Sequence, residues 1–201
     1  RLAVVGQMKG LFHQHRHGDP LPSTPALQEI IDLCRGVLFP GYYGRSTINR
    51  DTVKYGIGVD MERLYNLLVE QIEAGLCFCS DRTHHDCCDG DLHEHARDIA
   101  QRVVLRLPEV RDVLATDVEA AYLGDPAAQN WGEVISCYPA IKALTIYRIA
   151  HELEVLNVPL IPRIMTELAH SETGIDIHPA AQIGFFLASR TNIIIASFKS
   201  V

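Results

Sequence analysis

The sequence is short of positive charge, since 18 lysine and arginine residues stand against 25 aspartate and glutamate residues, for a net charge of −7. This deficit argues against nucleic acid and anionic membranes as main partners, because both are bound through clustered basic side chains. The sequence also has no apolar run that approaches the roughly 18 residues needed to span a bilayer. The first residues, RLAVVG, are too short for a signal peptide and carry no cleavage pattern, so we expect a cytoplasmic location.

Low-complexity stretches are absent too, and what is present is helical periodicity over most of the 201 residues. A chain of this length can bury a sizeable core. Residues 1–24 are expected to form an N-terminal arm and residues 25–170 a helical domain. Apolar spacing and Pro or Gly stops predict helices at residues 25–38, 60–75, 92–107, 108–124, 139–156 and 160–170. Pro108 and Pro139 are each expected to begin a new helix.

The run TGIDIHPAAQIG at residues 173–184 has a different pattern. Ile177 and Ile183 are six residues apart, with the small Ala180 and Ala181 between them. One aliphatic residue per six-residue step is typical of a parallel β-helix, whose coils must stack to bury their apolar edge. We therefore expect the first coils of a β-helix at residues 171–201.

Six cysteines are present, and four of them lie within twelve residues. They form a Cys/His cluster between Cys77 and His95, whose spacing does not match a standard zinc finger. The members of this cluster are Cys77, Cys79, His84, His85, Cys87, Cys88, His93 and His95. Thiolates and imidazoles suit zinc. The alternative is a polar loop between two helices, with partly buried cysteines, and we expect no metal.

Three sites hold residues that could take part in acid–base chemistry. Asp125 precedes Pro126 between two helices, a common turn pair. His151 lies in a helix, where a histidine usually has a structural role. Asp176 and His178 are two residues apart and would face the same side of a strand. An aspartate beside an imidazole can orient a general base, or the two residues can decorate a β-helix turn.

Several of these residues lie in long motifs, in a fixed order, that resemble bacterial serine O-acetyltransferases of the form with an extended N-terminal helical domain. The motifs are DVEAAYLGDPAA at residues 117–128, YPAIKALTIYRIAHEL at 138–153 and VPLIPRIMTELAHSETGIDIHPAA at 158–181, followed by Ile-Gly. The similarity is clearest from about residue 108 to 184. It implies an α+β fold: an all-helical N-terminal domain followed by the start of a left-handed parallel β-helix.

The resemblance also implies a reaction and its residues. Acetyl-CoA, as a co-substrate rather than a tightly bound cofactor, donates its acetyl group to the L-serine hydroxyl for cysteine biosynthesis. A histidine is the general base, and the aspartate that orients it corresponds to Asp176. A second aspartate, which binds the amino group of serine, corresponds to Asp125. The implied assembly is a homotrimer or hexamer, and O-acetylserine sulfhydrylase is an implied partner.

The sequence departs from this family pattern after Gly184. In the register that restores the six-residue step at Leu187 and Ile193, the positions of the family's Asp-His pair hold Ala188 and Ser189. No histidine follows His178. We therefore expect that the native protein is such an enzyme, and that this sequence is either a truncated or altered form of it or has its last 17 residues wrongly assigned. The alternative is a non-catalytic oligomerisation or regulatory module. A zinc-binding module built on the Cys/His cluster is a third reading.

Overall fold

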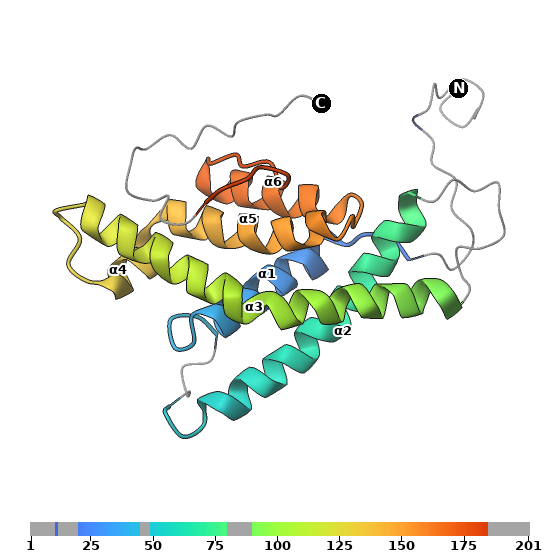
Figure 1. Ribbon diagram of the computed structural model, residues 1–201, viewed down its shortest axis with the longest axis horizontal. Coiled ribbons are helices and arrows are strands. Elements are labelled where there is room, and N and C mark those ends of the chain that lie inside the picture. The colour runs from blue at the N-terminus through green and yellow to red at the C-terminus, as the bar shows by residue number, and fades with distance from the viewer. Residues whose placement is uncertain (1–10, 12–19, 45–48, 80–89, 185–201) are drawn as a thin grey trace.

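The computed structural model describes residue 11 and residues 20–44, 49–79 and 90–184, and this part of the chain is helical. Its six helices are α1 (Thr24–Leu38), α2 (Val53–Cys79), α3 (Gly90–Gly124), α4 (Trp131–Cys137), α5 (Pro139–Val155) and α6 (Ile161–Thr173). In Figure 1, α5 and α6 lie side by side, and α3 crosses between this pair and α2. Helix α1 packs against α2, α3, α5 and α6, so it lies at the centre of the bundle.

The helix ends follow from local sequence. Ser23 caps α1 by accepting a hydrogen bond from the Ala26 amide at 3.4 Å, and a proline occupies the first turn of α1, α5 and α6. Helix α6 ends at Gly174, which adopts a left-handed conformation at φ 72°. Three of the predicted helices, α1, α5 and α6, therefore begin and end within a few residues of the predicted bounds.

Three helices differ from the prediction. Helix α2 runs from Val53 to Cys79 and so extends beyond both ends of the predicted helix at residues 60–75. Residues 90–124 form one continuous helix that contains Pro108 in its interior, so the predicted break at Pro108 is wrong. Apolar residues before and after Pro108 are buried in the same core, and this packing keeps the axis continuous. They include Val103, Leu107, Val110 and Leu114. The short helix α4 was not predicted, although Asn130 caps it through the Glu133 amide at 3.0 Å, a spacing that a search for helix caps would have found.

The expected α+β class is also wrong for the described chain, in which no strand occurs. Residues 175–184 instead run as an irregular extended segment that contains a turn at 179–180. A strand needs a neighbouring strand to accept and donate its backbone hydrogen bonds. Here several backbone groups of the segment bond to side chains of α5 instead. Residues 185–201, which were also assigned to β-helix coils, lie outside the described residues.

Candidate functional site

Asp125 lies in the turn between α3 and α4, and both of its carboxylate oxygens accept a hydrogen bond. The Ala127 amide donates to Oδ1 at 2.9 Å, and the Tyr138 hydroxyl donates to Oδ2 at 2.5 Å. Tyr138 stands at the junction of α4 and α5. The predicted turn aspartate is therefore tied to the first residue before α5, thirteen positions further along the chain.

These two hydrogen bonds favour the ionised form of Asp125. The Tyr138 hydroxyl is the larger cause and the Ala127 amide the second, and together they hold the pKa of Asp125 below its usual value. The same contact raises the pKa of Tyr138 to about 12, because a nearby carboxylate disfavours the phenolate. At neutral pH the pair is thus a negatively charged acceptor and a neutral donor.

Asp176 lies in the extended segment that follows α6, and its side chain is 55% exposed. Its Oδ1 lies 3.7 Å from Nη1 of Arg163 on α6. His178, two residues later, accepts a hydrogen bond from the Ala180 amide through Nδ1 at 3.1 Å. Asp125 and Asp176 therefore have partners on different elements.

Helix α5 holds the extended segment through three side chains: Tyr147, Arg148 and His151, here called the α5 contact residues. The Tyr147 hydroxyl donates to the Ala181 carbonyl at 2.5 Å and accepts from the Ile183 amide at 3.3 Å. His151 Nδ1 lies 2.7 Å from the Pro179 carbonyl. Because a carbonyl only accepts hydrogen bonds, Nδ1 must carry the proton in this contact. The predicted structural role of His151 agrees with this position.

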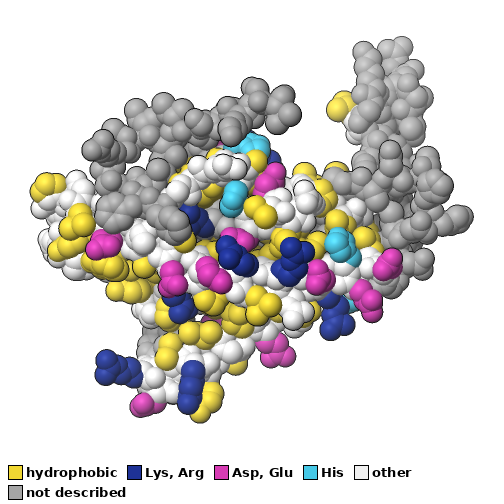
Figure 2. All heavy atoms as spheres, in the orientation of Figure 1, with side chains coloured by type: hydrophobic (Ala, Val, Ile, Leu, Met, Phe, Trp, Pro, Cys, Tyr) yellow, Lys and Arg dark blue, Asp and Glu magenta, His cyan; other side chains and the backbone are white. Residues whose placement is uncertain are grey.

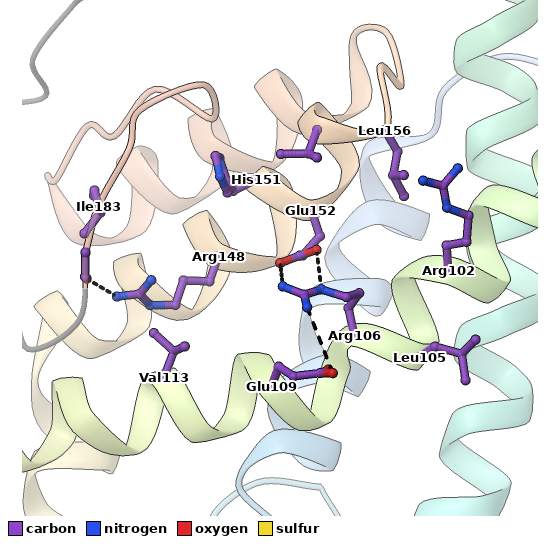
Figure 3. A pocket seen from close by; sticks show the side chains of 12 residues that line it. Arg102, Leu105, Arg106, Glu109, Val113, Arg148, His151, Glu152, Leu156 and Ile183 are labelled. Carbon is purple, nitrogen blue, oxygen red and sulfur yellow. Dashed lines mark hydrogen bonds and ion pairs between the residues drawn. The ribbon is translucent and has the colours of Figure 1, made fainter.

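Arg148 is the most buried charged group among the α5 contact residues. Its Nε and Nη2 lie 2.7 and 3.1 Å from the two carboxylate oxygens of Asp117 on α3. Its Nη2 also donates to the Gly184 carbonyl at 3.2 Å, a contact drawn in Figure 3. This pair was not predicted, because nothing in the local sequence links positions 117 and 148.

A pocket of 660 Å³ opens between α3 and α5 beside Arg148 and His151. Arg106 lines it and pairs with Glu152 at 3.1 and 3.3 Å, as Figure 3 shows. On the face seen in Figure 2, basic and acidic side chains alternate rather than segregate. Neither Asp125 nor Asp176 lines this pocket, so the two predicted site residues lie outside it.

The Cys/His cluster is only partly described. Cys77 is 1% exposed and packs in the interior, and His93 Nδ1 lies 2.8 Å from a carboxylate oxygen of Glu73 on α2. No group of three or more potential metal ligands occurs in the described residues. The Cys79 side chain and residues 80–89 lie outside them, so the expected absence of metal and the zinc alternative both remain predictions. In the same described part of the chain, no helix is long and apolar enough to cross a membrane.

No protein-family model matches the sequence, but individual proteins do. A plasmid-encoded serine acetyltransferase of Synechococcus elongatus is 44% identical over 180 residues, which cover 88% of this chain and 56% of that protein. A serine acetyltransferase of Synechocystis sp. is 51% identical over 71 residues, 35% of this chain and 28% of that protein.

The fold agrees with this similarity. The crystal structure of Entamoeba histolytica serine acetyltransferase 1 in complex with L-cysteine matches 82% of this chain and 53% of its own, with a TM-score of 0.63 and 28% identity. The chain thus spans about half the length of the relatives that it matches over most of its own length. It is a homologue of the serine acetyltransferases.

Proposed function

We propose that the protein to which this chain belongs is a serine O-acetyltransferase, which transfers an acetyl group from acetyl-CoA to L-serine. The observation that carries the proposal is the 44% identity over 88% of the chain to a serine acetyltransferase. The structural neighbour with bound L-cysteine supports a ligand of the amino-acid class. Acetyl-CoA acts as a substrate in this proposal, and the chain assembles as a homotrimer or hexamer.

In this proposal Asp125 binds the ammonium group of L-serine. An ionised carboxylate pairs well with an ammonium, and the Tyr138 and Ala127 hydrogen bonds keep Asp125 ionised. Each carboxylate oxygen has two acceptor positions, and one on each is used by these contacts. The remaining positions are available for an ammonium with three donors.

Asp176 orients the general base in the same proposal. A histidine takes the proton from the serine hydroxyl as that oxygen attacks the thioester carbonyl, and coenzyme A leaves as the thiol after the carbon–sulfur bond breaks. A carboxylate next to the imidazole fixes its tautomer and stabilises its protonated form. The half-exposed position of Asp176 leaves room for such a partner, since its ion pair with Arg163 is 3.7 Å long and open to solvent.

The test uses the complete reading frame that contains this sequence. Release of coenzyme A thiol is measured with acetyl-CoA in the presence and absence of L-serine. Asp125→Asn is expected to raise the KM for L-serine about tenfold or more, because a charged hydrogen bond contributes about 1.5–3 kcal/mol. Asp176→Asn is expected to lower kcat with little change in KM.

A matched control is Asp98→Asn, which removes an exposed carboxylate 3.8 Å from Arg102 on the surface of α3. This variant is expected to have wild-type kinetics. Absence of serine-dependent thiol release from the wild-type protein would contradict the proposed activity. The same complete protein would be tested for binding to O-acetylserine sulfhydrylase by co-purification.

One observation favours a second function, a non-catalytic oligomerisation module: the positions aligned with the family's Asp-His pair hold Ala188 and Ser189. This function would be favoured if the protein isolated from its source has an intact mass near 22.4 kDa, releases no thiol and forms a stable oligomer in light scattering. A larger mass together with serine-dependent activity would favour the enzyme.

A further inference from the structure

The Asp125 carboxylate is held by uncharged donors, in contrast to the carboxylates of Asp117 and Asp176. Asp117 and Asp176 each lie beside an arginine, which offsets their negative charge. Among the described residues, no lysine, arginine or histidine forms an ion pair with Asp125, and its side-chain partner is the neutral Tyr138 hydroxyl. The carboxylate is therefore held in place without losing its attraction for a cation.

We propose that Tyr138 is a positioning residue, which fixes the Asp125 carboxylate so that it binds the ammonium group of the amino-acid substrate. This inference rests on the proposed function, in which Asp125 is the ammonium-binding residue. Tyr138 acts only through Asp125 and need not touch the substrate. It selects for a cationic amino group, because the carboxylate that it orders keeps its full charge.

The backbone of Tyr138 is held from both sides, which makes the residue suited to this role. Its amide donates to the Val134 carbonyl at the end of α4, at 3.3 Å, and its carbonyl accepts from the Ile141 amide in the first turn of α5, at 3.1 Å. Pro139 follows and restricts the backbone conformation of Tyr138. The ring packs against the hydrophobic core. Two helices and a proline thus set the position of the hydroxyl.

The second hydrogen bond completes the restraint on Asp125. The Ala127 amide binds Oδ1 at 2.9 Å while the Tyr138 hydroxyl binds Oδ2 at 2.5 Å. A carboxylate held at both oxygens can rotate about neither χ1 nor χ2 without breaking a contact. Without Tyr138, only the local turn contact would remain, and the carboxylate would lose part of its order each time it binds an ammonium.

The test compares Tyr138→Phe, Asp125→Asn and the double variant in the complete protein. Tyr138→Phe is expected to raise the KM for L-serine about five- to fifteenfold, with kcat changed less than threefold and the KM for acetyl-CoA unchanged. In the double variant the KM should equal that of Asp125→Asn, because the tyrosine acts through the carboxylate. A merely structural tyrosine would lower kcat and affect both substrates.

Tyr43→Phe is the matched control, because the Tyr43 hydroxyl donates to the Ile135 carbonyl and so also ties a loop to α4. It is expected to leave the KM for L-serine unchanged. If the enzyme is active and Asp125→Asn raises this KM but Tyr138→Phe does not, the role of Tyr138 is overturned while the proposed function stands. A wild-type protein without serine-dependent activity would overturn the proposed function, and this inference with it.

Discussion

The buried pair between Asp117 and Arg148 offers a direct measure of what holds the extended segment on the bundle. The substitution Asp117→Asn keeps the size of the side chain and removes its charge. Asp117 is fully buried, and the Arg148 side chain is 9% exposed. The guanidinium would therefore stay in the interior without the carboxylate that binds it at 2.7 and 3.1 Å.

The expected loss follows from burial. Removing one partner of a buried ion pair costs about 3–5 kcal/mol, because the remaining charge is left uncompensated in a poorly solvated site. Two features place this case at the lower end of that range. Arg148 would keep its hydrogen bond to the Gly184 carbonyl, and the asparagine oxygen can still accept one hydrogen bond. We therefore expect the free energy of unfolding to fall by about 3 kcal/mol.

The chain contains its own control for this prediction. Glu152 and Arg106 form a second two-point pair at 3.1 and 3.3 Å, but these side chains are 19% and 53% exposed. Glu152→Gln is expected to cost less than about 1 kcal/mol, since solvent screens and replaces the lost contact.

Urea unfolding, followed by circular dichroism, measures both variants. With a slope of about 3 kcal/mol per molar urea, Asp117→Asn should lower the midpoint by about 1 M, and Glu152→Gln by no more than about 0.3 M. Equal midpoint shifts for the two variants would refute the argument from burial. Faster amide exchange at residues 181–184 in Asp117→Asn would show that the pair also holds the extended segment.

Three further predictions concern other parts of the structure. Tyr138→Phe should raise the lowered pKa of Asp125 towards its ordinary value in a carbon NMR titration, and an unchanged pKa would refute the assignment of the shift to Tyr138. The stabilisation from this contact is present above the ordinary aspartate pKa and is lost as the pH falls through the lowered pKa. Gly75→Ala should destabilise the protein by about 1–3 kcal/mol in urea unfolding, because a Cβ at Gly75 would lie 2.8 Å from a backbone oxygen of the α5–α6 loop. As a control, Gly58→Ala places its Cβ in open space and should cause no loss of stability. Cys34 should resist iodoacetamide at pH 8 in the native protein, because burial raises its pKa to about 12, and peptide mass spectrometry that found it modified would contradict this.

Most of the helices could be predicted from the sequence because their signals are local. Apolar spacing and terminal prolines predicted α1, α5 and α6 to within a few residues. Pro108 was misleading, because its usual effect on a helix is outweighed here by the buried residues on both sides of it. Helix α4 is only seven residues long, too short to show a periodic pattern, so its cap at Asn130 was the one usable signal.

The β-helix prediction shows the limit of a local pattern. The six-residue step at Ile177 and Ile183 specifies which residues are apolar, but an extended segment becomes a strand only where another segment pairs with its backbone. In the described residues the groups that bond to the backbone of this segment are mainly side chains, several of them from α5. The apolar residue Ile177 is buried as the pattern required, while no strand among the described residues pairs with its backbone.

The sequence by itself determined the helical periodicity, the similarity to serine acetyltransferases and the identity of Asp125 and Asp176 as candidate site residues. Only the tertiary structure decided which groups these and other charged residues contact: Tyr138 for Asp125, Arg163 for Asp176 and Arg148 for Asp117. The reason is physical. Helix formation depends on residues within one or two turns, whereas the partner of a carboxylate depends on how whole helices pack against one another, and that packing is set by the complete apolar surface of each helix.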